Sequence, residues 1–361
     1  MRIAQVSPLA ESVPPKRYGG TERVVSYLTE QLVADGHEVT LFASGDSVTA
    51  AELVAPCPRS LRLDKWSADH GVYQVLMLEQ VFARASEFDV IHFHIDYVHF
   101  PLTRRQSTPT LTTLHGRLDL PDLPAIFHEF PEMPVVSISD SQREPLEWLN
   151  WAATVHHGLP SDLYRFRDRP GDYLVFLGRL APSKRPDRAI EIAGRAGLPL
   201  KIAAKIDDAD RAYVDAEIAP LLKLPWVDYV GEVDEDGKRE LLSGALALLF
   251  PIDWPEPFGL VMIEAMACGT PVIAFRRGSV PEVIDDGVSG FIVDDTPQAV
   301  RAVERAHRLD RRRCREAFER RFTDRRMAEE YVRIYQRLRE HHGNQRTSTR
   351  PGAGGRGHPG R

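Results

Sequence analysis

Several features that organise other proteins are scarce or missing in this sequence. Its three cysteines, Cys57, Cys268 and Cys314, are odd in number and far apart, so they offer neither a disulfide framework nor a Cys-x-x-Cys metal pair. No apolar run is long enough to span a bilayer. The N-terminus enters a predicted strand directly, without the hydrophobic segment of a signal peptide. We therefore expect a cytoplasmic protein.

An excess of positive charge is missing too. The formal net charge is −6 at pH 7, which argues against general binding to nucleic acid or to an anionic membrane. Arginines collect between Arg301 and Arg326, but Glu304, Asp310 and Glu316 lie among them, so we expect a solvated helical face there. No nucleic-acid partner is expected, whereas peripheral membrane contact stays open.

The chain is long enough for two hydrophobic cores. It has 361 residues, of which 43% are hydrophobic and 27% charged, as in soluble globular proteins. Short apolar strands alternate with helical patterns, which predicts an α/β fold with parallel sheets. The predicted strands are 2–7, 37–43, 89–96, 110–114 and 135–138 in the first half, and 172–178, 200–204, 227–230, 247–251 and 271–275 in the second.

These patterns predict two doubly wound, Rossmann-like domains that face each other across a cleft. We place the first at residues 1–160 and the second at 161–325. A helix at 326–341 is expected to pack back on the first domain. Residues 342–361 are rich in Gly, Arg and Pro and lack core-forming side chains, so we expect a disordered tail.

The loop after the first strand holds Gly19-Gly20 and leads into a helix that Thr21 is expected to cap and Gly36 to end. The loop lacks the Gly-x-Gly-x-x-Gly pattern of dinucleotide binding, which counts against an NAD enzyme. Gly19 and Gly20 still bring bare backbone to the carboxyl edge of the sheet. The alternative is that they only make the turn.

Histidines gather at the ends of two predicted first-domain strands. The pattern His92-x-His94-x-Asp96 resembles the start of a metallo-hydrolase motif, but Tyr97 stands where a further histidine is expected. A polar strand end beside a cleft is therefore favoured over a metal site. His115 follows the strand 110–114, where parallel sheets bind ligands, and it is a candidate active-site residue.

The most informative stretch runs from Asp253 to Cys268. Glu256 lies in its Pro-rich loop, and Glu264 lies inside the apolar helix that follows, where a carboxylate needs a partner. The backbone N–H groups near Phe258, Gly259 and Leu260 would form an anion site at the helix start. A phosphate site beside two carboxylates suggests a sugar nucleotide.

Two cations strengthen that interpretation. Arg179 and Lys184 share one short loop after the first strand of the second half. A planar guanidinium and a compact ammonium together suit a diphosphate.

With these motifs in place, the sequence closely resembles the retaining GT-B glycosyltransferases of family 4, also called glycosyl transferases group 1. The segment from Glu256 to Glu264 matches the E-x7-E motif of that family, and residues 265–273 and 278–282 match the sequence that follows it. Gly178-Arg179 and Lys184 match its phosphate loop, Gly19-Gly20 its glycine loop, and His115 its first-domain histidine. The resemblance extends to about residue 340.

The resemblance implies a role for each residue. His115 and Glu256 would contact the transferred sugar and carry the catalysis. Glu264 would bind ribose, and Glu232, within the backbone of 231–233, would edge the base. The remaining donor-binding residues would surround the diphosphate: Gly19, Gly20, Arg179, Lys184, Phe258, Gly259 and Leu260. No metal or cofactor is implied, because Arg and Lys would neutralise the charge.

The base (uridine, guanosine or adenosine), the sugar and the acceptor stay open, and the acceptor is any hydroxyl of a carbohydrate, lipid or small molecule. Lys205 is an extra cation at the expected cleft, and Trp254 either stacks on a sugar or packs beneath Pro255. The acidic runs 207–208 and 234–236 are interpreted as solvated helix starts. Alternatives to a transferase are a sugar-nucleotide 2-epimerase of GT-B architecture and a non-catalytic sugar-nucleotide-binding protein.

Overall fold

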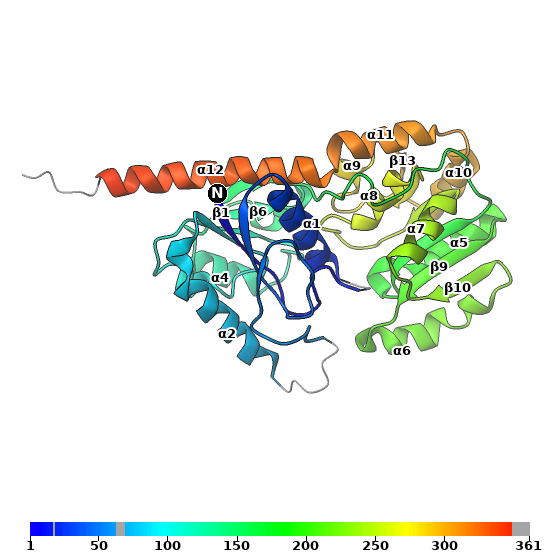
Figure 1. The fold of residues 1–361 in the computed structure, drawn as a ribbon. Coiled ribbons are helices and arrows are strands. Elements are labelled where there is room, and N and C mark those ends of the chain that lie inside the picture. The colour runs from blue at the N-terminus through cyan, green and yellow to red at the C-terminus, as the bar shows by residue number, and fades with distance from the viewer. Residues whose placement is uncertain (17–18, 63–68, 349–361) are drawn as a thin grey trace, which may run out of the picture.

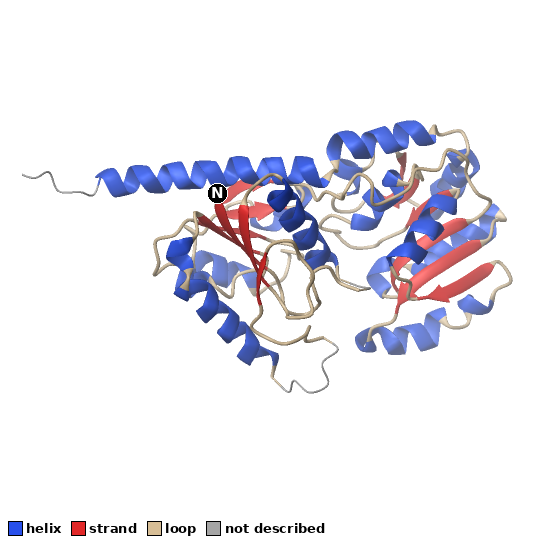
Figure 2. Cartoon of the chain, viewed as in Figure 1, coloured by secondary structure: helices blue, strands red, loops and turns tan. Residues whose placement is uncertain are grey.

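The computed structural model describes residues 1–16, 19–62 and 69–348, with side chains described as far as residue 342. Its strands form two separate sheets with helices on both faces, which lie side by side in Figures 1 and 2. All the strand pairings between named strands are parallel. The predicted α/β architecture with two doubly wound sheets is confirmed.

The first sheet has the order β3-β2-β1-β4-β5-β6-β7. Its strands are β1 (Arg2–Val6), β2 (Glu38–Phe42), β3 (Glu52–Val54), β4 (Val90–Phe93), β5 (Thr110–Thr113), β6 (Val135–Ser137) and β7 (Trp151–Thr154). Its helices are α1 (Gly20–Ala34), α2 (His70–Ala83), α3 (Phe100–Thr103) and α4 (Leu123–Glu129). The central strands are buried along their whole length, as expected for parallel strands covered on both faces.

The second sheet has the order β10-β9-β8-β11-β12-β13. Its strands are β8 (Leu174–Arg179), β9 (Leu200–Lys205), β10 (Val227–Gly231), β11 (Ala247–Phe250), β12 (Val272–Phe275) and β13 (Gly290–Val293). Its helices are α5 (Pro186–Ala196), α6 (Arg211–Tyr213), α7 (Glu235–Gly244), α8 (Leu260–Ala267), α9 (Val280–Val283), α10 (Thr296–Ala306) and α11 (Arg311–Arg321).

Strand order reverses once in each sheet, between β1 and β4 and between β8 and β11. Successive connections leave such a point toward opposite faces, which opens a crevice at the carboxyl ends of the strands. The carboxyl ends of these strands supply His94, Arg179 and the loop that follows Phe250. Both sheets thus direct their ligand-binding edges toward residues predicted to form the site.

The chain crosses between the two halves twice, and the crossings touch. The Leu159 amide donates to the Phe322 carbonyl at 2.9 Å, and the Asp324 amide donates to the Leu159 carbonyl at 3.0 Å. At Gly158 an added Cβ would lie 2.2 Å from the Thr323 carbonyl oxygen. Glycine is therefore required for this close approach of two backbones.

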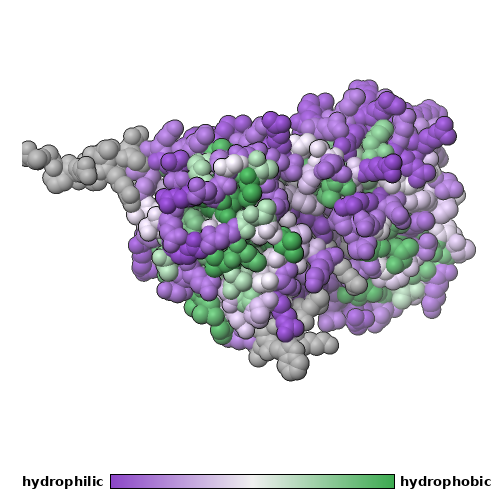
Figure 3. All heavy atoms as spheres, in the orientation of Figure 1, coloured by the Kyte–Doolittle hydropathy of each residue, from purple (hydrophilic) through white to green (hydrophobic). Residues whose placement is uncertain are grey.

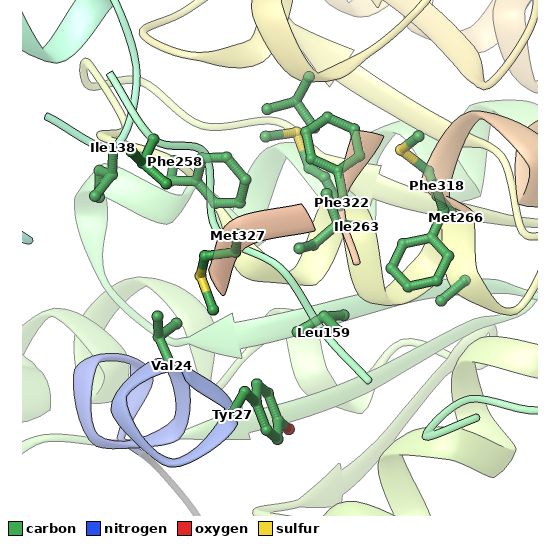
Figure 4. Packing of buried hydrophobic residues seen from close by; sticks show 14 of the residues in the cluster. Val24, Tyr27, Ile138, Leu159, Phe258, Ile263, Met266, Phe318, Phe322 and Met327 are labelled. Carbon is green, nitrogen blue, oxygen red and sulfur yellow. The ribbon is translucent and has the colours of Figure 1, made fainter. Parts of the chain in front are cut away.

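A single hydrophobic cluster joins the halves. Val24 and Tyr27 of α1 pack in the same cluster as Leu159 of the first crossing and Ile263 of α8 (Figure 4). Met327, which follows the second crossing, belongs to it as well. The two sheets are therefore held in one arrangement by shared apolar burial as well as by the covalent crossings.

The last helix, α12 (Asp324–Ser348), runs along the first half of the molecule (Figure 1). The Tyr335 hydroxyl lies 2.7 Å from Nδ1 of His92 on β4, and the Tyr331 hydroxyl lies 2.8 Å from the Thr113 hydroxyl on β5. The helix extends to Ser348, so the expected tail from residue 342 was wrong as far as 348. The last turns of a helix can form with their own backbone hydrogen bonds alone, without core-forming side chains. Residues 349–361 lie outside the described residues.

One further local expectation was wrong, and the expected solvated face between Arg301 and Arg326 has an exception. Gly19, not Thr21, is the N-cap of α1, and it contributes no side-chain bond. Arg311 in the arginine-rich segment is buried, and its guanidinium donates to the carbonyls of Arg167, Ala245 and Ser243. Charge periodicity alone did not show that unpaired carbonyls lay opposite it.

The surface is mainly hydrophilic in the view of Figure 3, with hydrophobic side chains in patches between. Within residues 1–16, 19–62 and 69–348, none of the helices combines the length and the hydropathy needed to cross a lipid bilayer.

Candidate functional site

A cavity of about 520 Å³ opens between the two sheets and takes its walls from both. Every residue that the sequence placed in the site contributes to its lining. These are Gly19, Gly20, His115, Arg179, Lys184, Glu232, Glu256, Phe258, Gly259, Leu260 and Glu264. The structure therefore brings together residues that lie as far apart in the sequence as Gly19 and Glu264.

One part of the wall is cationic, and its cations are held by carboxylates. Arg179 at the end of β8 places Nη1 3.1 Å from Oδ2 of Asp207 and Nε 3.3 Å from Oδ2 of Asp210. Lys205, at the end of β9, pairs with the same Asp207. Partial burial disfavours the charged Asp207, but hydrogen bonds from Lys205 and Arg179 outweigh it and hold its pKa below the ordinary value. Asp207 is thus a partner of the phosphate-loop cation rather than only a solvated helix start.

A second group joins the predicted phosphate and sugar residues directly. Lys184 forms an ion pair with Oε2 of Glu256, and the Trp254 indole N–H donates to the same oxygen at 3.1 Å. The Lys184 ammonium lies 4.7 Å from the centre of the Trp254 ring. Trp254 is outside the cavity lining, and its N–H holds the Glu256 carboxylate in place.

Two helix starts meet at the cavity. The N-terminus of α1 lies against that of α8, because a Cβ added to Gly20 would touch Leu260 at 3.7 Å. Gly259, the N-cap of α8, has φ 80, and an added Cβ there would lie 2.8 Å from Met262 Cε and 3.1 Å from Phe250. Free N–H groups and the positive ends of two helix dipoles therefore border the same space.

Glu264 is buried inside α8, and its partner is a lysine that the sequence did not reveal. Oε1 of Glu264 lies 2.6 Å from Nζ of Lys238 on α7. That ammonium also lies 3.2 Å from Glu235, which pairs across the domains with Nη1 of Arg23 on α1 at 2.5 Å. Burial opposes ionisation of Glu235, but Lys238 and Arg23 hold its pKa below the ordinary value. Tyr164, in the crossing segment, donates to Glu235 at 2.5 Å.

His115 ends a chain of buried hydrogen bonds that starts on α12. Gln5 donates its Nε2–H to the Tyr335 hydroxyl at 3.1 Å, and its Oε1 lies 2.8 Å from Nε2 of His94. Nδ1 of His94 lies 2.9 Å from Nε2 of His115. With Gln5 in this orientation His94 donates from Nε2, so its Nδ1 accepts the proton of His115 Nε2. Burial lowers the pKa of His115 to about 3, so the ring is neutral at pH 7.

The metal interpretation of His92 and His94 has no support in this geometry. The His92 nitrogens bond Tyr335 and Thr113, and those of His94 bond Gln5 and His115. In the part of the chain that the structure describes, no group of three or more metal-ligating side chains is assembled. The strand end supports His115 from behind, and neither His92, His94 nor Asp96 lines the cavity.

Sequence reasoning missed the partners of the predicted residues, namely Asp207, Lys238, Glu235, Arg23 and His157. Asp234 was interpreted correctly, because it caps α7 through a bond from the Gly237 amide. Lys238 and Glu235 lie one helical turn apart in α7, and this spacing was the one available signal for a paired face. The contact of Arg23 with Glu235 depends on the packing of two domains, which no local pattern records.

Comparison with known proteins adds independent findings. The family model described as "Glycosyl transferases group 1" matches residues 166–321, and the model "Glycosyltransferase Family 4" matches residues 18–188. Together these two models extend from residue 18 to residue 321. They overlap over residues 166–188, close to the segment in which the chain first crosses between the sheets.

Individual relatives and a solved structure agree. The phosphatidyl-myo-inositol mannosyltransferase of Mycolicibacterium smegmatis is 27% identical, with 86% of this chain and 90% of that protein covered. A D-inositol 3-phosphate glycosyltransferase of the same organism is 33% identical, but only 40% of this chain and 32% of that protein are covered. The structure of Anabaena HepE in complex with UDP and glucose superposes with a TM-score of 0.68 at 18% identity, covering 95% of this chain and 100% of the other.

The cleft between two doubly wound parallel sheets is the GT-B architecture, and the two family models account for both sides of it. The phosphate loop, the E-x7-E segment and the first-domain histidine all border one cavity. The chain is therefore a glycosyltransferase enzyme that belongs to the family 4, group 1 glycosyltransferases with the GT-B fold.

Proposed function

We propose that the cavity binds a nucleoside-diphosphate sugar and that the enzyme transfers the sugar to a hydroxyl acceptor with retention of anomeric configuration. The observation that carries the proposal is a convergence of charge. Arg179, Lys184 and Lys205 border the same cavity as two helix starts, while Glu256 and Glu264 line it as hydrogen-bond acceptors. A ligand with an anionic middle and hydroxyl-rich ends satisfies both sets.

In the proposed complex the diphosphate competes with protein carboxylates for the cations. Asp207 holds Arg179 and Lys205, and Glu256 holds Lys184. These ion pairs keep the cations in the cavity, and a diphosphate would take over part of their coordination. The cations and the helix starts neutralise the leaving group, so no metal ion is required. Transfer activity that survives EDTA unchanged supports this part of the proposal.

The two ends of the donor have distinct neighbours. In the proposed complex Glu264 accepts hydrogen bonds from ribose hydroxyls, since a carboxylate accepts two in parallel. Glu232 and the adjacent Val233 border the cavity at the end of β10, where the base would lie. The UDP held by the similar HepE makes UDP the first nucleotide to try, followed by GDP and ADP.

The proposed reaction proceeds on one face of the sugar. The acceptor oxygen forms a bond to the anomeric carbon while the bond from that carbon to the diphosphate oxygen breaks. The acceptor proton passes to an oxygen of the departing diphosphate, which leaves on the same side. Glu256 and His115 orient the sugar, and the cations stabilise the charge that develops on the diphosphate.

For the acceptor, the names of two relatives provide a starting panel. Both names include an inositol unit, which is phosphorylated in one name and part of a lipid in the other. We therefore propose polyol acceptors, with inositol derivatives first. The first-domain side of the cavity carries Glu11, Glu22 and Arg62, which are polar groups suited to hydroxyls.

A thermal-shift screen with UDP-, GDP- and ADP-linked sugars tests donor binding, because a ligand of the native state raises the midpoint by mass action. NMR of the product with each acceptor then reports the anomeric configuration. Retained configuration supports the proposal, and inverted configuration refutes the mechanism. An epimerised nucleotide sugar without acceptor would identify an isomerase, and tight binding without turnover would identify a binding protein.

A further inference from the structure

Glu282, in the short helix α9 of the second half, makes polar contacts with the first half of the molecule. Its Oε2 accepts a hydrogen bond from the Asp140 amide, and its Oε1 accepts one from the Ser141 amide, both at 2.7 Å. Nε2 of His156 lies 3.2 Å from Oε2. These donors belong to the segments that follow β6 and β7 of the first sheet. One carboxylate therefore joins the two halves.

The surroundings of this carboxylate favour its charged form. The Glu282 side chain is 21% exposed. Partial burial disfavours ionisation, but hydrogen bonds from His156 and from the two backbone amides outweigh it and hold the pKa of Glu282 below the ordinary value. An ionised carboxylate only accepts hydrogen bonds, so His156 donates to it as the amides do. Bonds to a charged acceptor are shorter and stronger than bonds between neutral groups.

Within the second half, the residues before Glu282 bind the loop of Glu256. The Ser279 amide donates to the Glu256 carbonyl at 3.0 Å, and the Ser279 hydroxyl donates to the Phe258 carbonyl at 2.8 Å. A Cβ added to Gly278 would lie 2.3 Å from the Glu256 carbonyl oxygen, so glycine is required for this approach. The Glu282 amide donates to the Ser279 carbonyl at 2.9 Å. A single turn of backbone therefore connects Glu282 with the Glu256 loop.

Within the first half, the same contact leads to the turn that carries His115. Ser141 begins a 3₁₀ helix, and Gln142 is its second residue. The Gln142 side chain is buried, and its Nε2 donates to the carbonyls of Leu114 at 2.9 Å and Gly116 at 2.7 Å. These two carbonyls lie on either side of His115 in the sequence. The start of this 3₁₀ helix therefore fixes the backbone around His115.

Apolar side chains pack beside these hydrogen bonds. Val280 and Val283 of α9 are buried in the hydrophobic cluster that joins the halves. Ile138, two residues before Asp140, belongs to the same cluster as Phe258, and the two side chains lie close together in Figure 4. The contacts of Glu282 are therefore part of a packed junction between the halves.

We propose that Glu282 is a positioning residue for the transfer, because its carboxylate holds the His115 turn of the first half against the Glu256 loop of the second. The inference rests on the proposed roles of His115 and Glu256, and it gives a task to the segment 278–282. Glu282 is outside the cavity lining, so it acts through the two loops. Domains joined by crossing segments tend to move relative to each other, and these hydrogen bonds oppose that motion.

Three variants separate positioning from local stability. Glu282→Ala removes all the hydrogen bonds of the carboxylate. Glu282→Gln keeps the shape and one oxygen acceptor but turns its N–H₂ group toward a backbone N–H. Asp285→Asn is the matched control, because Asp285 follows on the same segment but pairs with Arg320 and Arg321 of the second half. Urea unfolding and circular dichroism establish that each variant is folded.

Spin labels on Leu102→Cys in the first half and Lys223→Cys in the second report the arrangement of the halves. Both positions are exposed, whereas the native cysteines are buried. We expect a narrow distance distribution in the wild-type background and in Asp285→Asn. The distribution in Glu282→Ala should be at least about twofold wider, with Glu282→Gln between them. Calorimetry with UDP, GDP and ADP should give affinities within about twofold in all variants, because the cations belong to the second half.

Steady-state kinetics measures the consequence for catalysis. The donors are UDP-, GDP- and ADP-linked glucose and mannose, and the acceptors are myo-inositol and its phosphate. With the pair that the wild type uses, Glu282→Ala is expected to lower kcat about tenfold or more, while the donor KM stays within about twofold. Asp285→Asn is expected to change neither constant.

An unchanged distance distribution in folded Glu282→Ala would overturn the inference, as would a kcat equal to that of the wild type. Equal effects of Glu282→Ala and Asp285→Asn would overturn it too, because local stability would then be the cause. The distance measurement needs no substrate, so it decides the inference even where the wild type binds none of the diphosphates. That absence of binding would instead contradict the proposed function.

Discussion

At the scale of single residues, Glu264 shows how a partner changes the meaning of a motif. It is the second glutamate of the E-x7-E segment and is 4% exposed, yet its carboxylate is bound to Lys238 at 2.6 Å. An unpaired charge in such surroundings would carry a large desolvation cost. The pair fixes the carboxylate at the cavity wall, so Glu264 is both a structural partner and the proposed ribose acceptor.

We predict that Glu264→Ala lowers the free energy of unfolding by about 3 kcal/mol, because Lys238 loses the buried one of its two carboxylate partners. The double variant Lys238→Met/Glu264→Leu is expected to recover most of this loss. Glu240→Ala, at an exposed position of the same α7, should change stability by less than about 0.5 kcal/mol. Urea unfolding measures all three. Equal losses in the single and double variants would show that the ion pair is not the cause.

Buried neutral histidines make a second residue-scale prediction. Burial lowers the pKa of His99 to about 3, below the value of about 6.5 in the unfolded chain. The unfolded state therefore binds the proton first, so stability is present above pH 6.5 and is lost as the pH falls toward 3. Removing the group as His99→Gln should reduce the stability difference between pH 7 and pH 5 by about 2 kcal/mol.

The measurement is the urea unfolding free energy at the two pH values, compared as a difference so that the mutation's own cost cancels. His99 is suitable because it bonds Thr112 at 3.0 Å and lies outside the cavity lining. If His99→Gln leaves the difference between the unfolding free energies at pH 7 and pH 5 unchanged, His99 binds protons alike in the folded and unfolded states.

At the scale of elements, the start of α8 is the most constrained part of the site. Gly259 adopts a left-handed conformation, and a side chain there meets Met262 and Phe250. Gly287 also has a positive φ of 77, but no atom lies within 4 Å of an added Cβ. The two glycines therefore share a positive φ, which would strain any L side chain placed there, and differ in crowding.

We predict that Gly259→Ala weakens diphosphate binding by about tenfold or more, because the crowded Cβ displaces the helix start that faces the ligand. Gly287→Ala should cost about 1 kcal/mol of stability through strain alone and leave binding unchanged. Calorimetry with the bound diphosphate, together with urea unfolding, distinguishes the two effects. Comparable loss of binding in both variants would argue against a specific role for the α8 start.

Elements with strong periodicity were predictable from the sequence, whereas elements defined by their neighbours were not. The helix Pro186–Ala196 carries sequence signals at both ends, because proline opens it and Gly197 closes it. Strands β3, β7 and β13 were missed. They are short strands away from the sheet centres, and pairing rather than sequence pattern makes them strands.

The same division applies to the site. Residue types and motif spacing in the sequence pointed to Gly259, Arg179 and Glu264, because the residues that mark a phosphate site lie in short local segments. The partners of these residues come from other elements. Lys238 reaches Glu264 from α7, and Asp207 reaches Arg179 from the segment after β9. Tertiary packing decides such pairs, and a single sequence does not encode it in a local pattern.

At the scale of the whole molecule, the ion pair between Arg23 and Glu235 links the two sheets beside the cavity. Arg23 belongs to α1 and Glu235 to α7, and both side chains are largely buried. The same region contains the apolar cluster of Figure 4, with Tyr27 close to Leu159. The arrangement of the domains is therefore stabilised at the edge of the proposed nucleotide site.

We predict a coupling free energy of about 1–3 kcal/mol between Arg23 and Glu235 in a double-mutant cycle with Arg23→Met and Glu235→Gln. The exposed pair of Arg195 and Glu191 on α5 is the control, with an expected coupling of about 0.5 kcal/mol or less. Urea unfolding supplies the four free energies for each cycle. Similar coupling in the two cycles would mean that the interdomain pair is screened like a surface pair.

The central claim is that the cations after β8 bind a nucleoside diphosphate in the cleft. Calorimetric titration of UDP, GDP and ADP into the wild type, Arg179→Ala/Lys184→Ala and the exposed-site control Arg195→Ala tests it most directly. We expect the wild type and Arg195→Ala to bind one of the diphosphates alike, and the double variant to bind it at least about 100-fold more weakly. Equal affinity in the folded double variant, or no binding of any diphosphate by the wild type, would contradict the account.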